Sequence, residues 1–314
     1  MSKQTNSKTI KTSIGGQAVI EGVMMRGPKL TALSVRMPDQ SISTETWDTP
    51  NSNKWYKKTP FIRGVFNFVE SLTDGYKSLM KAAEKAGLDD EEEEPSKFEQ
   101  KLRQLLGDKF MPFLQGCILL FSLAMALFFF AFLPTTLVGF FKDYINHPLA
   151  LSALEGLTKI AILILYLALI SNMSDIKRVF MYHGAEHKTI FCYEHGEELT
   201  VENVRKYTRF HPRCGSSFMI LMLLLGIIIG FFIPFSNPFL RTFCKLLCLP
   251  IVVSIGYELI KLCGKYDNVL TRIIAAPGLW FQRLTVKEPT DKMMEAAIAA
   301  MKAVIPENGE DIIR

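Results

Sequence analysis

A short stretch of the sequence combines residue types that bind metal ions and transfer protons. Residues 182–188 contain the pattern His-x-x-Glu-His. On a helix, His183 and His187 lie one turn apart on the same face, and Glu186 falls on the same stripe. Two imidazoles can then bind a zinc-like divalent ion while the carboxylate reaches a bound water, as in the inverzincin pattern. Gly184 lies inside the stretch and argues against a helix there.

Two further segments supply potential ligands. His211 and Cys214 stand three positions apart, a spacing that zinc knuckles use. Pro212 biases His211 towards an extended conformation, so a turn is expected to present the pair. Glu258 lies within an apolar run, where a carboxylate is costly and usually faces a partner or a cavity.

These residues leave three arrangements open. His183, His187, His211 and Cys214 would together make a closed tetrahedral site, which is usually structural. His183, His187 and Glu258 with one water would leave an open position, which is usual in catalytic sites. In the third arrangement no metal binds, the histidines hydrogen-bond at the membrane surface, and Glu258 pairs with a nearby Lys or Arg.

The N-terminal region carries a second group of polar residues in an apolar setting. Glycines at 15–16 and the Gly27-Pro28 pair permit tight turns around short apolar strands. Glu21 and Arg26 lie between them, either to bind a ligand or partner or to form a salt bridge in a small β unit. Neither phosphate-binding glycine pattern occurs in the chain, so nucleotide-driven transport by this chain alone is not expected.

The elements that must position these residues are mostly membrane-spanning helices. A bilayer needs roughly 20 apolar residues per helix. Four runs approach or exceed this length, at 110–141, 157–173, 214–240 and 246–262. A shorter piece at 273–281, broken by Pro277-Gly278, is expected in the membrane interface. We therefore expect an α-helical membrane protein with about four transmembrane helices and small cytoplasmic α+β elements.

The same pattern divides the chain into five parts. Residues 1–109 hold the N-terminal β unit, an amphipathic helix over 60–85 and an acidic linker at 89–94. Two transmembrane hairpins, 110–174 and 214–263, flank a His/Cys-rich cytoplasmic segment at 175–213. Residues 264–314 form a cytoplasmic or interfacial tail.

Charge distribution predicts the orientation of these parts. Segment 175–213 carries seven Lys and Arg residues, whereas the connection after the first run carries only Lys142. The positive-inside rule then places this segment and both termini in the cytoplasm, with the chain in the plasma membrane. The first thirteen residues are polar and lack the apolar core of a signal peptide.

Overall composition fits this interpretation. The net charge of +5 and the pI near 8.8 follow from membrane orientation, so a specific nucleic-acid partner is not expected. The six cysteines are scattered among apolar runs and segments placed in the cytoplasm, where thiols stay reduced, and do not indicate a disulfide framework. The lipid bilayer is the expected partner.

Several long motifs resemble one family. Residues 15–28, the motif at 183–188, the stretch 211–218, and the tail at 277–285 with Glu288-Pro289 are similar to the YqhQ-like family of bacterial multi-pass membrane proteins. The resemblance covers nearly the whole chain. It implies a multi-pass plasma-membrane protein of a group described as predicted metal-dependent enzymes.

The preferred functional hypothesis is a metal-dependent hydrolase at the cytoplasmic face, acting on a membrane peptide or a lipid-linked substrate. His183 and His187 would bind a divalent metal, zinc by preference, with Glu258 or the His211 and Cys214 pair completing the ligand set. Glu186 would be the general base.

The alternative hypothesis is a non-catalytic scaffold with a structural metal site. It would assist assembly, insertion or transport of other membrane proteins. Its basic cytoplasmic surface would contact anionic lipid, a ribosome or a translocon. A small-molecule transporter is disfavoured because intramembrane charges are few and no internal repeat is visible.

Overall fold

The structure is a computed structural model that describes residues 10–50, 54–87, 97–145, 147–235, 237–266 and 268–313. The chain folds as two compact units. Unit 1 comprises Met1–Leu88, Leu167–Leu223 and Pro250–Arg314, and unit 2 comprises Asp89–Tyr166 and Leu224–Leu249. The acidic run predicted as a linker, 89–94, lies outside the described residues.

Unit 1 contains the small N-terminal β unit that the glycine pattern predicts. Four strands, β1 (Gly15–Val19), β2 (Gly22–Arg26), β3 (Leu30–Arg36) and β4 (Ile42–Asp48), form an antiparallel sheet in the order β1-β2-β3-β4. Val19 pairs with Gly22 across the first hairpin, and Glu21 in its turn adopts a left-handed φ of 51°. The expectation of an N-terminal β unit is therefore confirmed.

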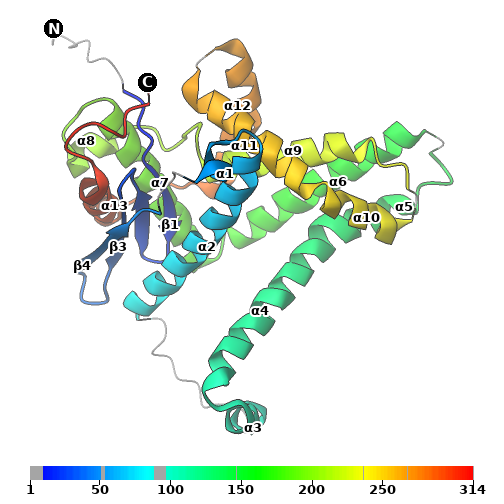
Figure 1. Ribbon diagram of the computed structural model, residues 1–314, viewed down its shortest axis with the longest axis horizontal. Coiled ribbons are helices and arrows are strands. Elements are labelled where there is room, and N and C mark those ends of the chain that lie inside the picture. The colour runs from blue at the N-terminus through cyan, green and yellow to red at the C-terminus, as the bar shows by residue number, and fades with distance from the viewer. Residues whose placement is uncertain are drawn as a thin grey trace. The chain divides into compact units, whose positions relative to one another are not determined.

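Helices lie against both faces of this sheet (Figure 1), and its alternating side chains are buried on both. Val23, Met25 and Ala32 face a core that they share with α7 (Ser174–Glu194) and α13 (Asp291–Val304). On the opposite face, Met24 and Leu33 pack against α2 (Ile62–Lys85). The sheet is therefore the middle layer of unit 1, and α7 is held on one side of it.

The other helices of unit 1 surround this core. They are α1 (Trp55–Lys58), α8 (Val201–Arg205), α11 (Leu249–Lys265) and α12 (Val269–Thr285). Unit 2 contains α3 (Lys97–Leu106), α4 (Phe110–Leu127), α5 (Leu133–Gly139) and α10 (Pro238–Leu247), with a 3-10 turn at Gly107–Lys109 and a π-helical turn at Phe128–Phe132. The helices α6 (Pro148–Ile170) and α9 (Gly215–Gly230) contribute residues to both units.

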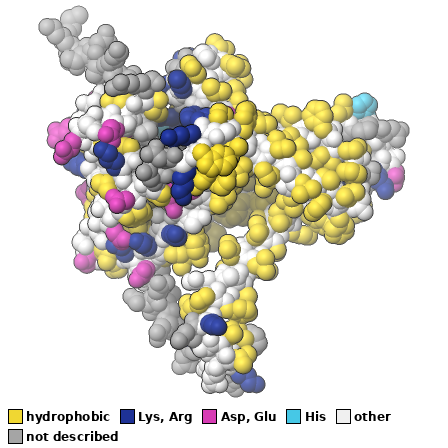
Figure 2. All heavy atoms as spheres, in the orientation of Figure 1, with side chains coloured by type: hydrophobic (Ala, Val, Ile, Leu, Met, Phe, Trp, Pro, Cys, Tyr) yellow, Lys and Arg dark blue, Asp and Glu magenta, His cyan; other side chains and the backbone are white. Residues whose placement is uncertain are grey.

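Two helices are long and apolar enough to cross a membrane, Phe110–Gly139 and Leu149–Ile170. The pair α10 and α11, bent by 46°, makes a third if it is one span. Figure 2 shows hydrophobic side chains crowded over α6, α9 and α10, while Lys, Arg, Asp and Glu gather over the sheet and its neighbouring helices. These helices are consistent with membrane association.

The expectation of about four spans is supported only in part. The run 214–240 forms a helix of 16 residues that ends at Gly230, about 24 Å long and shorter than the roughly 30 Å hydrocarbon core. A turn follows it, because Pro234 cannot donate the hydrogen bond that would continue the helix. The run 246–262 is likewise bent near Pro250. The described residues thus provide two to three candidate spans.

Unit 2 also encloses a charged cluster. The buried carboxylate of Glu155 on α6 accepts a hydrogen bond from Thr135 at 2.8 Å and pairs with Lys159 at 3.0 Å. The Arg241 side chain contacts the Oε2 atom at 3.1 Å. Lys245 pairs with Oε1, the oxygen that Thr135 and Lys159 also contact. One carboxylate therefore serves three cations that are each mostly buried.

Replacing this shared carboxylate should destabilise unit 2. We expect Glu155→Gln to lower the free energy of unfolding by on the order of 3 kcal/mol, because three buried cations would then face one another. The measurement is the thermal midpoint of the detergent-solubilised protein. Glu84→Gln, at an exposed site on α2, is the matched control. Equal midpoints for the two variants would contradict the prediction.

In unit 1, a buried carboxylate ties the N-terminal segment to α7. Glu194 accepts a hydrogen bond from the Thr12 backbone N–H at 2.9 Å and pairs with Arg213, and His211 lies 3.9 Å away. Burial alone would raise the pKa of Glu194, but the His211, Arg213 and Thr12 contacts outweigh it and hold this pKa below its usual 4.5.

This depressed pKa predicts an acid-dependent stability. A carboxyl group with a lower pKa in the folded state contributes stability that is complete above its unfolded pKa and is lost as pH falls through the folded value. We expect the thermal midpoint to decline from about pH 4.5 downward, and to decline less steeply in Glu194→Gln. Parallel pH profiles for wild type and variant would show that Glu194 is not responsible.

Candidate metal centre

The helix α7 passes very close to the backbone that follows α12. A Cβ on Gly184 would lie 2.0 Å from the carbonyl oxygen of Lys287, which no real side chain could tolerate. The Lys287 N–H in turn donates to the Phe180 carbonyl at 2.9 Å. The expectation that Gly184 argues against a helix is therefore wrong, because the residue lies within α7 and permits this contact.

Three of the predicted ligands converge on one point. The Nε2 atom of His183 lies 3.0 Å from the Sγ atom of Cys214. The rings of His183 and His187 are 4.5 Å apart, and the ligand atoms of all three residues lie within 4.8 Å of one another. The two histidines lie one turn apart on α7, which brings their rings together. Cys214, the residue directly before α9, lies beside them.

Backbone carbonyls determine which ring nitrogen of each histidine carries hydrogen and which presents a lone pair. The Nδ1 atom of His183 contacts the Thr285 carbonyl at 3.1 Å, and that of His187 contacts the Arg209 carbonyl at 2.5 Å. A carbonyl oxygen only accepts, so both Nδ1 atoms carry hydrogen in these contacts, and a neutral ring then presents an Nε2 lone pair. The Nε2 atom of His187 is buried and has no hydrogen-bond partner among the described residues. Metal-binding histidines commonly show this arrangement.

The electrostatic setting favours the ligand forms of these side chains. Burial lowers the pKa of His187 to about 4, so its imidazole is neutral at pH 7. Burial opposes ionisation of the Cys214 thiol, but His187 and Ser216 outweigh it and lower the pKa of that thiol. The Ser216 hydroxyl lies 3.1 Å from the sulfur. Neutral imidazole and thiolate are the forms that bind metals.

Glu186 lies beside the three ligands, with only half of its carboxylate engaged. The Gly16 N–H donates to the group, whereas its Oε2 atom is buried without a partner among the described residues. Burial raises the pKa of Glu186 to about 8, with His183 opposing and Cys214 adding to the rise. A Cβ on Gly16 would lie 2.9 Å from the Glu186 side chain, which explains why a glycine stands there in β1.

A cavity of about 660 Å³ opens onto this group. His183, Glu186, His187 and Cys214 form part of its wall. Strand β1 and the segment before it line another side, and Tyr257, Ile260 and Lys261 of α11 complete the enclosure. A small molecule in this cavity would therefore lie next to the cluster residues and Glu186.

His211 lies next to the cluster but outside it. Its ring is 5.4 Å from that of His187, centroid to centroid, and its buried Nε2 atom points towards Glu194 at 3.9 Å. Gln282 holds the His211 backbone, donating to its carbonyl at 2.7 Å and accepting from its N–H at 2.8 Å. Burial lowers the pKa of His211 as well.

Glu258 is not brought to the cluster. Its carboxylate accepts from the Arg63 side chain at 2.7 Å and from the Phe61 backbone N–H at 3.1 Å. This is the ion pair that the metal-free arrangement anticipated for Glu258. The residue that lies with His183 and His187 in the structure is Cys214 instead.

Glu21 and Arg26 each form ion pairs, but not with one another. Glu21 accepts from Arg178 and, at 3.3 Å, from the Tyr182 hydroxyl, both on α7. Arg26 pairs with Glu70 at 2.5 Å and with Asp74 at 3.3 Å, both on α2. The two residues therefore fasten the β unit to the helices on its two faces.

Sequence reasoning did not identify the residues that support the ligands. Gln282 is fully buried and holds His211, and the Thr285 and Arg209 carbonyls orient the two ligand histidines. Backbone carbonyls leave no signal in a sequence. The sequence feature that could have indicated Gln282 is its position, since this glutamine directly follows the apolar stretch 273–281.

Comparison with known proteins places this architecture in a family. The family model described as "Protein of unknown function (DUF1385)" matches residues 59–307. An "Uncharacterized protein YqhQ" from Bacillus subtilis (strain 168) is 34% identical over 299 residues, which cover 94% of this chain and 93% of that relative. No solved structure matches the chain. The chain therefore belongs to the YqhQ-like family of the DUF1385 group.

Proposed function

We propose that this chain is a metal-dependent hydrolase with His183, His187 and Cys214 as its metal ligands and Glu186 as its general base. The observation that carries the proposal is the convergence of two Nε2 atoms and one thiol sulfur, with both Nδ1 atoms held by backbone carbonyls. A buried carboxylate oxygen without a partner stands beside them.

The donor set fits zinc. Zinc favours tetrahedral sites built from histidine nitrogen and cysteine sulfur, and catalytic sites use three protein ligands and leave the fourth position open. The Nε2 atom of His187 is buried without a hydrogen-bond partner among the described residues, and such an ion would bind to its lone pair. When bound, zinc supplies Lewis-acid activation of water and of a substrate oxygen.

Glu186 has the position and chemistry of a proton carrier. Glu186 lines the cavity beside the proposed ligands, and its pKa of about 8 lies near neutral pH. A group with such a pKa can accept a proton from water and later return it to a leaving group. The Gly16 N–H fixes the carboxylate so that the other oxygen remains available.

The proposed location is the cytoplasmic face of the plasma membrane, with both termini in the cytoplasm. The seven Lys and Arg residues of segment 175–213 support this orientation. The site itself lies on α7, which directly follows the apolar helix Leu149–Ile170 in the chain, and at the start of α9. A membrane peptide or a lipid-linked molecule is therefore the proposed class of substrate.

A scaffold with a structural metal remains the second proposal. The buried Nε2 atom of His211 has no hydrogen-bond partner among the described residues, and its ring lies 5.4 Å from that of His187. A rotation of this ring would add a fourth protein ligand and close the site. The protein would then assist other membrane proteins or a translocon, and Glu186 would have no catalytic role.

Metal content distinguishes the two proposals. We expect about one zinc per chain in detergent-purified protein, because the three ligands converge. The metal should be lost in His183→Ala and Cys214→Ser and kept in His211→Ala and Glu258→Gln. The measurement is elemental analysis, with cobalt substitution reporting the thiolate ligand through its charge-transfer absorption. Loss of metal in His211→Ala would favour the closed structural site, and a folded, metal-free wild type would end both proposals.

Glu186→Gln should separate binding from catalysis. We expect the variant to keep its metal and to lose about 10²–10⁴-fold in turnover, because the amide cannot accept the proton. The measurement is release of fluorescent product from labelled phospholipid or labelled membrane peptide in proteoliposomes. Glu198→Gln, exposed just beyond α7, is the matched control. Full turnover in Glu186→Gln would refute the general-base assignment.

A further inference from the structure

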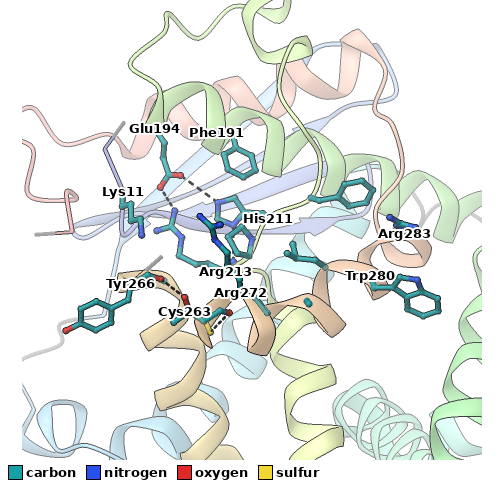
Figure 3. Close-up of a pocket in the computed structure, with 17 residues that line it drawn as sticks. Lys11, Phe191, Glu194, His211, Arg213, Cys263, Tyr266, Arg272, Trp280 and Arg283 are labelled. Carbon is teal, nitrogen blue, oxygen red and sulfur yellow. Dashed lines mark hydrogen bonds and ion pairs between the residues drawn. The ribbon is translucent and has the colours of Figure 1, made fainter. Parts of the chain in front are cut away.

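A second pocket shares the His211 side chain with the cavity of the metal centre. It has a volume of about 630 Å³ and is lined by α7, by the turn at 210–213 and by the α11–α12 hairpin (Figure 3). His211, Arg213 and Gly264 line both this pocket and the cavity of the metal centre. The two spaces are therefore neighbours that share a wall, and we call this one the outer pocket.

The outer pocket carries unbalanced positive charge. Its single acidic residue, Glu194, is already taken up by Arg213 and the Thr12 backbone. Lys11 donates to the Lys265 carbonyl at 3.3 Å, a neutral partner that leaves its charge uncompensated. Arg283 forms no hydrogen bond or ion pair with any described residue. Figure 3 shows Lys11 and Arg283 on opposite sides of the pocket. An anionic group between them would be attracted by both.

The rest of the lining is apolar and continues onto an exposed apolar surface. Phe191, Phe210 and Leu279 contribute to the wall, and Trp280 lies at its edge beside Arg283 (Figure 3). On its outer side α12 exposes large apolar side chains: Val269 at 74%, Leu270 at 66%, Ile273 at 63% and Trp280 at 55%. A helix with such a face, with Trp beside Arg, lies in a membrane interface.

We propose that the outer pocket binds the negatively charged, phosphate-bearing head group of a membrane lipid. This inference rests on the proposed hydrolase, of which such a lipid would be the substrate. Arg283 offers the planar donor fork that matches phosphate oxygens, and Lys11 adds a second charge. The lipid chains extend along the apolar outer face of α12. A free inorganic anion would make no use of that apolar surface.

The shared wall of His211, Arg213 and Gly264 brings the outer pocket close to the metal centre. The His211 ring stands 5.4 Å from the His187 ring and 4.6 Å from that of Phe191 in the outer pocket. A Cβ on Gly264 would lie 2.9 Å from the Arg213 side chain, so the glycine lets Arg213 lie against α11 between the two spaces. A head group held here therefore has the metal centre as its immediate neighbour.

Trp280 provides a local probe for the test. The chain contains three tryptophans, and Trp47→Phe with Trp55→Phe leaves Trp280 as the only one. The full-length protein in neutral detergent is titrated with phosphatidate or phosphatidylcholine carrying the same brominated acyl chains, which quench nearby tryptophan. We expect phosphatidate to reach half-maximal quenching at a clearly lower mole fraction.

Variants in the same background test the two cations. We expect Lys11→Gln and Arg283→Gln each to weaken the preference for phosphatidate by about fivefold, the effect of one basic residue near an anionic lipid. Lys302→Gln, an exposed change on α13, should leave it unchanged. Equal quenching by the two lipids, or an equal preference in Lys302→Gln and Arg283→Gln, would overturn the proposal.

Competition distinguishes a lipid from a free anion. Unlabelled phosphatidate should displace the brominated lipid, whereas millimolar inorganic phosphate should not, and displacement by phosphate would overturn the assignment to a lipid. The readout requires neither metal nor turnover and is repeated in Glu186→Gln. Glu186→Gln should bind the lipid as the wild type does. In the metal-loaded wild type, binding without hydrolysis would refute the proposed enzyme and keep the lipid site, while hydrolysis without selective binding would do the reverse.

Discussion

The contact between α7 and the backbone after α12 is the constraint on which the rest of the site depends. Because Gly184 has no side chain, the Lys287 carbonyl can lie against the helix, and the Lys287 N–H bonds to Phe180 one turn earlier. The same approach places the Thr285 carbonyl on the ring of His183. The orientation of the His183 ring thus depends on the short distance between α7 and the backbone at Lys287, which a Cβ at position 184 would increase.

Burial of a polar helix explains why the neighbouring side chains are so constrained. Glu186, His187 and Lys188 are all buried, and each buried polar group must find a partner or cost free energy. Lys188 pairs with Glu288, and His187 uses one nitrogen on the Arg209 carbonyl. What remains unsatisfied is one nitrogen of His187 and one oxygen of Glu186, on the side where Cys214 stands. The unpartnered nitrogen of His187 therefore lies within the group of residues that could hold a metal ion, and Glu186 lies beside that group.

The sequence predicted what depends on local spacing and missed what depends on distant partners. The helical interval between His183 and His187 places both rings together whatever surrounds them. The Gly27-Pro28 pair lies in the turn between β2 and β3, as predicted, whereas Gly15 and Gly16 lie inside β1 and the turn after that strand is at residues 20–21. The partner of Glu258 could not be predicted in this way. Its apolar setting indicates that a carboxylate there needs a partner, but not which cation supplies it, and Arg63 lies 195 residues away in the chain. Gly184 was misread for a related reason, since helix propensity is local while its close contact is tertiary. The count of about four spans is supported only in part, because a continuous apolar run such as 214–240 does not show that its helix ends at Gly230.

The role of His211 illustrates how the two spaces are joined. Its backbone is held on both sides by the Gln282 amide, and the same amide donates to Ser217 at 2.9 Å. Gln282 belongs to α12, whose other face exposes large apolar side chains, and Ser217 belongs to α9. A displacement of α12 would therefore move the wall at His211 and also the Thr285 carbonyl that orients His183. The position of α12 is thus coupled to the His183 ring and to the His211 backbone through two neighbouring sets of hydrogen bonds.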